Sequence, residues 1–324
     1  MNKDVNFING IIKSREGALI TPDKLARLIE CESADEALTA LREYGFGKGA
    51  ETERATEYEK LLAAETYALT ELLRDYSPSG KLRRCFFARN DFHNAECAVR
   101  LHYGYGNEKM FLPQGEISVA ALKIAIDEDF KGVPHYLSEP MKRAVIALEA
   151  GAAAGGAVSL IFLRAYYAYM LALVPRGAYK DAVRHEIDGI NVATALRAFD
   201  EEQAARSYIQ GGKITVRQLG FLASRDTANA TQAFAFTDFS KAVESGLKAK
   251  EEGKPLVFLE RECDGYFLRK LKERRYETEG VLPILLYKAY KENEIKNVRI
   301  ILAGLVSRVN KDEIKERLRE GYGG

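Results

Sequence analysis

The sequence has little proline, with 8 prolines in 324 residues, where average usage is about 5%. It also lacks a convincing alternation of apolar and polar residues, which half-buried β-strands require. Alanine, leucine, glutamate, lysine and arginine, which favour helices, are abundant. We therefore predict an all-α protein without a large sheet.

The sequence also has no marked excess of positive or negative charge. The 48 basic and 47 acidic residues nearly cancel, so no overall field would attract nucleic-acid phosphates or anionic lipids. The 4 cysteines show no C-x-x-C spacing, and the N-terminus lacks the apolar core of a signal peptide. We expect a protein of the reducing cytosol with buried free thiols, and no nucleic-acid partner.

Residues at the spacing of a catalytic or metal centre are absent as well. The 4 histidines have no partner at a metal-ligand spacing such as H-E-x-x-H. Residues 44–49, YGFGKG, resemble a phosphate-binding loop but lack the G-K-[ST] ending and a surrounding βαβ unit. We interpret them as a helix-ending glycine loop. The sequence predicts no catalytic residue, no cofactor and no metal.

One long apolar stretch, residues 144–174, contains only Glu149 and Arg164 as charged residues. A membrane span needs about 20 apolar residues, and only 14 lie between these two charges. A charge at mid-bilayer costs about 2.5 kcal/mol or more. We therefore interpret the stretch as core helices, broken near its glycines, and expect no membrane span.

A short pattern, which we name the capping mark, occurs three times at intervals of 97 residues. It joins an isoleucine, a hydroxyl residue and a leucine four positions further on. The hydroxyl can cap a helix, while the two apolar residues can pack against each other as a hydrophobic staple. The three marks predict helix starts, and they are Ile20-Thr21 with Leu25, Ile117-Ser118 with Leu122, and Ile214-Thr215 with Leu219.

A second motif places an asparagine three positions after an acidic residue. Its copies are Asp91-x-x-Asn94, Asp188-x-x-Asn191 and Glu294-x-x-Asn297. The first two copies are 97 residues apart and the third follows after 106, which indicates a small insertion in the third repeat. Each acid opens an apolar-periodic run, so we expect it at a helix start, where the helix dipole favours a carboxylate.

We interpret these acids and asparagines, together with Thr21, Ser118 and Thr215, as scaffold residues of the repeat. An asparagine in the first turn of a helix can bond a loop carbonyl and so fix how the helices pack. A catalytic residue would rarely be triplicated in one chain. Repetition therefore argues against a single active centre.

The repeats predict three helical domains, residues 1–110, 111–207 and 208–324, each large enough for a small core. Within the last domain, residues 260–275 predict an amphipathic helix. Its basic end, with Arg274 and Arg275, could meet an acidic partner.

From end to end, the sequence resembles the family of C subunits of V-type and A-type rotary ATPases, whose eukaryotic equivalent is the d subunit. The resemblance lies in residues 7–16 with Leu19 and Ile20, in residues 90–94, and most specifically in residues 291–302, which read KENEIKNVRIIL. None of these segments is a catalytic signature. The match is one of overall pattern, length and repeat.

The resemblance implies a funnel of three similar helical domains around a pseudo-threefold axis. Such a protein is a non-catalytic socket in the central stalk: its cavity receives the foot of the shaft, subunits D and F, and its other face rests on the cytoplasmic loops of the proteolipid ring. It would transmit torque between ATP hydrolysis or synthesis and proton or sodium transport. It would be cytoplasmic and peripheral to the membrane.

Loops at repeat ends commonly line a shared mouth or base. Gly115, Gly211, Gly212, Arg274 and Arg275 are therefore our hypotheses for partner contacts. One alternative is a generic α-helical repeat scaffold that binds other proteins, although its repeats would be about 20 to 50 residues long. Another is an enzyme with a site between repeats, for which the sequence supplies no cluster of titratable groups.

Overall fold

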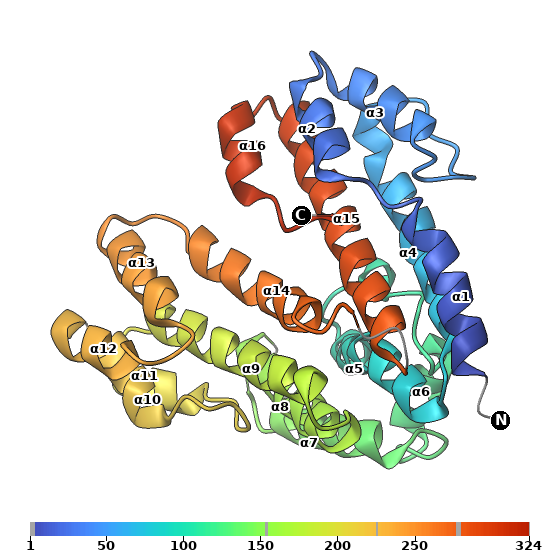
Figure 1. Ribbon diagram of the computed structural model, residues 1–324. Helices are drawn as coiled ribbons and strands as arrows, with labels where there is room; N and C mark the ends of the chain where they lie inside the picture. Colours follow the sequence, from blue (N-terminus) through green and yellow to red (C-terminus); the bar gives the residue numbers. More distant parts are fainter. Residues whose placement is uncertain (1–3, 153–154, 225, 277–279, 324) are drawn as a thin grey trace. The chain divides into compact units, whose positions relative to one another are not determined.

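The computed structural model describes residues 4–152, 155–224, 226–276 and 280–323. Every regular element in these ranges is a helix, which confirms the all-α prediction (Figure 1). The helices group into two compact units, Met1–Ser79 with Val257–Gly324, and Gly80–Leu256. The first unit therefore joins both ends of the chain.

The first unit is built around one long helix, α15. This helix contacts every other α-helix of the unit, and its Val298, Ile301 and Leu302 are fully buried in the unit's apolar core. In Figure 1 it lies along α4 and beside the N-terminal helices. The elements are α1 (Val5–Glu16), α2 (Pro22–Glu30), α3 (Ala34–Glu43), η1 (Ala55–Glu57), α4 (Tyr58–Tyr76), α14 (Val257–Lys272), α15 (Leu282–Val306) and α16 (Lys311–Arg317).

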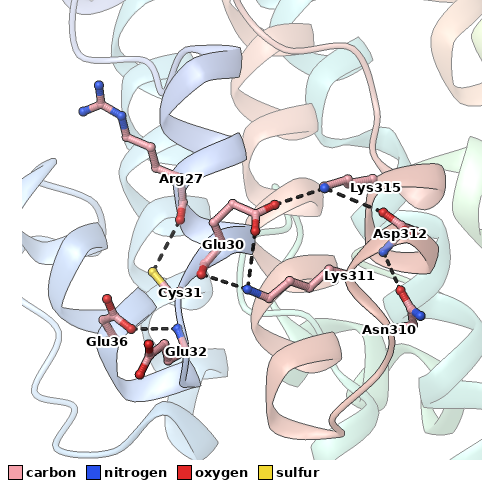
Figure 2. A network of polar contacts seen from close by, with 9 residues as sticks. All are labelled: Arg27, Glu30, Cys31, Glu32, Glu36, Asn310, Lys311, Asp312 and Lys315. Carbon is pink, nitrogen blue, oxygen red and sulfur yellow. Dashed lines mark hydrogen bonds and ion pairs between the residues drawn. The ribbon is translucent and has the colours of Figure 1, made fainter.

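Polar contacts at the surface add to this joining of the chain ends (Figure 2). The carboxylate of Glu30, at the end of α2, lies 3.0 Å from the Lys315 ammonium on α16. The Lys311 ammonium donates to the Glu30 carbonyl oxygen at 2.8 Å. A hydrogen bond and the charge of Lys315 lower the pKa of Glu30. Because these side chains are exposed, water and salt screen each pair, and the pairs contribute little to stability.

The second unit contains two helix groups. In one, α5 packs against α6, α7 and α8, and in the other, α9 packs against α10, α11 and α13, while α8 contacts α9. The elements are α5 (Gly80–His102), η2 (Glu108–Met110), α6 (Val119–Asp127), α7 (His135–Glu149), α8 (Gly156–Leu173), α9 (Ala178–Arg197), α10 (Glu201–Arg206), α11 (Val216–Ala223), α12 (Thr227–Phe234) and α13 (Ser240–Glu251).

The long apolar stretch forms the C-terminal part of α7 and the whole of α8, with a break that contains Gly151 at φ 83°. Among the described residues, α8 is the one helix whose length and composition would allow it to cross a membrane. Its Val158, Phe162, Tyr167 and Met170 are buried in the core of the second unit. One face of α8 therefore packs in the core of the second unit, with 28% of the helix buried, and the absence of a membrane span stays a prediction.

Helices begin at all three capping marks. Ser118 accepts a hydrogen bond from the Ala121 amide, and Thr215 accepts one from the Gln218 amide in a complete capping box. Thr21 occupies the same position before α2, but its side chain makes no capping hydrogen bond. The capping role predicted for Thr21 is therefore wrong. Pro22 fixes the first helical φ there and has no amide to satisfy.

The acidic residues of the second motif are not at helix starts, which corrects the sequence-based expectation. Asp91, Asp188 and Glu294 lie in the middle of α5, α9 and α15. Apolar residues upstream, such as Leu82 and Phe86 in α5, extend each helix toward its N-terminus and are themselves buried. The acids therefore need partners other than the helix dipole.

The domain boundaries at residues 110 and 207 stay a prediction, as does the threefold arrangement. The contacts group the helices in another way, because α15 packs with the N-terminal helices α1 to α4. The cysteines also differ in part from expectation: Cys85 and Cys97 are buried free thiols, whereas Cys31 and Cys263 are partly exposed.

The caps yield a matched pair of variants. Thr215→Ala removes a side-chain acceptor from the Gln218 amide, so we expect a loss of about 1 kcal/mol in the free energy of unfolding. Thr21→Ala, at the equivalent position, removes no cap bond and is expected to change it far less. Urea unfolding of both variants measures the difference. Equal losses would contradict this account of the two caps.

Candidate functional site

The residues of the second motif bind main-chain groups of a loop, in an arrangement that we name a clasp. In the α5 clasp, Asp91 Oδ1 accepts hydrogen bonds from the amides of Glu116 at 2.7 Å and Ile117 at 3.1 Å. Asn94 donates to the Leu112 carbonyl at 2.7 Å and accepts from the Leu112 amide at 2.8 Å. Both clasp side chains are buried. The clasp fixes the loop that leads into α6.

The α9 clasp repeats this geometry 97 residues further on. Asp188 accepts from the amides of Lys213 at 2.8 Å and Ile214 at 2.9 Å. Asn191 donates to the Ile209 carbonyl at 2.8 Å and accepts from its amide at 2.9 Å. Each of these five residues lies 97 positions after its counterpart in the α5 clasp. The repeat thus preserves a set of tertiary contacts as well as helix starts.

The α15 clasp joins the two ends of the chain. Glu294 Oε2 accepts a hydrogen bond of 2.5 Å from the amide of Ile20, a residue that lies 274 positions earlier in the chain. Asn297 donates to the Arg319 carbonyl at 2.9 Å and accepts from its amide at 2.7 Å. Ile20 belongs to the first capping mark, as Ile117 and Ile214 belong to the second and third. The acid of each long helix therefore binds the amide of the isoleucine in front of one of the helices α2, α6 and α11.

Two of the glycines expected to contact partners lie against these carboxylates. A Cβ atom on Gly115 would come within 2.8 Å of Asp91 Oδ1, and one on Gly212 would overlap the Asp188 carboxylate. Gly211 has φ 111°, and a Cβ there would overlap Leu171. At all three positions, packing within the protein therefore explains why the residue is glycine. Their contact with a partner stays a prediction.

A buried ammonium supports the α15 clasp. Lys291 Nζ lies 2.6 Å from Glu65 Oε2 and also pairs with Glu294. Glu65 Oε1 in turn accepts from the Gly47 amide at 2.5 Å. Gly47 belongs to the glycine loop that follows α3, where its φ is 70°. The loop thus ends a helix, as predicted, and the Gly47 amide binds a carboxylate of the same unit. Sequence reasoning missed Glu65 and Lys291, because no spacing connects them.

Burial dominates the electrostatics of the clasps. It raises the pKa of Asp91 to about 6 against the opposing effect of two amide hydrogen bonds, and it raises the pKa of Asp188. Burial also raises the pKa of Glu294, beyond what Lys291 compensates. For Lys291, burial acts to lower the pKa, but Glu294 and Glu65 together outweigh it and raise the pKa. The Lys291 ammonium thus forms ion pairs with both carboxylates, Glu65 and Glu294.

The basic end of residues 260–275 lies beyond α14, where Arg274 and Arg275 are exposed. The Arg275 guanidinium lies 5.0 Å from the centre of the Tyr276 ring and donates to its hydroxyl at 3.0 Å. A partner contact at Arg274 and Arg275 stays a prediction. Within the described part of the chain, no three His, Cys, Asp or Glu residues converge as a metal site would require.

Comparison with known proteins places the chain in a family. The sequence pattern of the family described as ATP synthase (C/AC39) subunit matches residues 8–317. The C subunit of a V-type sodium ATPase from Enterococcus hirae is 24% identical over 97% of this chain and 98% of its own length. The C subunit of an A-type ATP synthase from Methanocaldococcus jannaschii is 22% identical over 96% and 85%. The chain therefore belongs to the ATP synthase (C/AC39) subunit family, a family of rotary ATPase subunits.

The buried ammonium provides a first test of the site. Lys291→Ala would leave Glu65 and Glu294 buried without a cation, so we expect a loss of about 3–5 kcal/mol in the free energy of unfolding. The matched control is Lys60→Ala, which breaks the exposed pair with Glu57 and should destabilise far less, because water and salt screen an exposed pair. Urea unfolding compares the two. Similar losses would mean that the Lys291 pairs contribute no more than a surface pair.

The raised pKa of Asp91 provides a second test. In Asp91→Asn the side-chain oxygen can still accept both amides, because both donate to Oδ1. The stabilising effect of a raised carboxyl pKa is complete below the unfolded value of 3.8 and is lost as pH rises through about 6. From pH 4 to 7, wild type should therefore lose about 2.4 kcal/mol relative to the variant, since one pKa unit corresponds to about 1.4 kcal/mol and pH 4 already lies slightly above the unfolded pKa.

Urea unfolding of wild type and Asp91→Asn at each pH measures this difference. Subtracting one curve from the other removes the contributions of all other titrating groups. A difference that stays constant, or that grows in favour of wild type as pH rises, would contradict the raised pKa.

Proposed function

We propose that the chain is a non-catalytic central-stalk subunit of a V-type or A-type rotary ATPase. In this role it is a socket that receives the shaft subunits D and F and rests on the cytoplasmic loops of the proteolipid ring. It transmits torque between ATP hydrolysis or synthesis and proton or sodium transport. It is cytoplasmic and peripheral to the membrane. The observation that carries the proposal is the match to named C subunits of rotary ATPases along nearly the whole chain.

The clasps favour a mechanical role over a catalytic one. The buried acids and amides that recur in the sequence are engaged with main-chain groups or, for Glu294, also with Lys291. A side chain engaged in this way holds structure rather than exchanging protons with a substrate. Fixed loops and capped helices also make a stiff body, as a part that transmits torque must be.

The direct test is a pull-down of the tagged full-length protein from detergent-solubilised native membranes, with mass spectrometry of the proteins recovered. We expect the shaft subunits D and F together with the proteolipid. Recovery of the tagged chain without any ATPase subunit, from membranes whose separately purified intact ATPase also lacks this chain, would refute the proposal. Recovery of other proteins alone would favour the alternative of a generic helical scaffold.

The same assay tests the basic end after α14. Arg275→Glu reverses an exposed charge and should lower recovery of the shaft or the ring several-fold without changing urea unfolding, because rim charges act mainly on association. Lys48→Glu, an equally exposed reversal in the same unit, is the control and should leave recovery unchanged. Equal recovery with both variants would remove Arg275 from the interface.

A further inference from the structure

Residues 318–322, which follow α16, cross α15 as a segment that we name the strap. Asn297 binds both main-chain groups of Arg319, and the Asn293 side chain donates to the Glu320 carbonyl at 3.1 Å. Both asparagines are buried and lie one turn apart on α15. α15 therefore fixes the path of the strap through main-chain contacts, which leaves the side chains of the strap for contacts with other helices.

These side chains join the strap to three further helices of the first unit. The Glu320 carboxylate pairs with the Lys272 ammonium at the end of α14. The Tyr322 hydroxyl donates to a carboxylate oxygen of Glu16, at the end of α1, at 3.4 Å. A Cβ atom on Gly321 would lie 3.5 Å from a side chain of α2, in ordinary van der Waals contact. The strap thus connects α1, α2 and α14 across α15.

α14 is anchored near both of its ends by α16 and the strap. Among the helices its main contact is with α15. Near the start of α14, the Arg261 guanidinium donates to the Glu316 carbonyl, in the last turn of α16, at 3.0 Å. At its end, only 17% of the Lys272 side chain and 29% of the Glu320 side chain are exposed. Such a partly buried pair is screened less by water and salt than a pair at the open surface.

The basic end that follows α14 comes close to the strap at Tyr290 of α15. The Tyr290 ring meets the Tyr322 ring edge-on, with the ring centres 5.2 Å apart. Burial and the charge of Glu320 raise the pKa of Tyr290 to about 12, whereas the charge of Arg275 acts to lower it. Lys272, which the strap holds, is three positions before Arg275. The strap, Tyr290 and the basic end therefore form one cluster.

We propose that the strap is a positioning device that holds α14 on α15 and thereby fixes the basic end, Arg274 and Arg275, at the surface. A segment with few buried contacts opens locally at a low free energy, so the anchors determine how often α14 leaves α15. Because the strap is held at α1 and α2 as well, loss of a distant anchor also loosens α14. The part of this inference that concerns partner binding rests on the proposed function.

Hydrogen exchange of the full-length protein tests the strap directly. Glu320→Gln keeps the size of the side chain and removes the charge that pairs with Lys272. We expect exchange of peptides from α14 to quicken at least about threefold, because a charge-assisted contact is lost. Glu313→Gln, the same change at an exposed residue of α16, is the control and should leave α14 unchanged. Equal exchange of α14 in both variants would overturn the proposal.

Charge reversal separates the ion pair from a general loss of stability. Lys272→Glu places two carboxylates side by side, so exchange of α14 should quicken more than in Glu320→Gln. The double variant Lys272→Glu, Glu320→Lys restores opposite charges, and its exchange should return toward that of wild type. A double variant that exchanges as fast as Lys272→Glu would overturn the pair as an anchor of α14.

The distant anchor distinguishes a strap from a local ion pair. Tyr322→Ala removes the contacts with Tyr290 and Glu16 and leaves Lys272 and Glu320 in place. We expect exchange of α14 to quicken in this variant too, because a strap that is loose at one end holds Glu320 less firmly. Faster exchange confined to α1 and α15 would overturn the strap.

The consequence for partner binding is measured with the pull-down of the tagged full-length protein. Glu320→Gln should recover several-fold less of the shaft or the ring than wild type and Glu313→Gln do. Equal recovery would overturn the positioning of the basic end, even if exchange of α14 quickens. If wild type itself recovers no ATPase subunit, the proposed function fails, whereas the exchange measurements still decide whether the strap holds α14.

Discussion

The structure depends on a carboxylate buried in the middle of a helix, because burial of such a charge is costly unless polar partners hold it. Asp91 and Asp188 find those partners in two consecutive loop amides. Because the carboxylate binds main-chain amides, it fixes the loop in one position. The loop in turn fixes the residue at which the next helix begins. The caps at Ser118 and Thr215 and the packing of Leu122 and Leu219 follow from that position.

Local chemistry in the sequence predicted the helical class and the three helix starts, because staples and caps connect residues only a few positions apart. It misplaced the acids at helix starts, since an acid before an apolar run looks the same whether the helix begins there or upstream. The distance of 26 residues from Asp91 to Ile117 recurs from Asp188 to Ile214, and this was a usable signal. No comparable sequence signal existed for the contact between Glu294 and Ile20, or for the roles of Glu65 and Lys291. These contacts depend on how the two ends of the chain meet.

For the proposed torque coupler, the clasps supply stiffness where a helical protein is weakest, at its loops. A loop that hydrogen-bonds only to water yields under load, whereas one held by a buried carboxylate and a buried amide yields only if those groups lose their partners. The same contacts support the interpretation of the recurring motif as a scaffold. Function in such a protein resides in shape and surface, and the repeated residues maintain the shape.

The three clasps also face different entropic costs. The internal ones close loops of 26 residues, while the terminal one brings together residues 274 apart. For a flexible chain this longer closure costs about 2 kcal/mol more. The terminal clasp has the additional contacts to offset that cost: the buried Lys291 between Glu65 and Glu294, and the surface pairs of Glu30 with Lys311 and Lys315. The third copy of the motif thus differs from the other two at the place where the two ends of the chain meet, where a buried ammonium replaces one of the two loop amides.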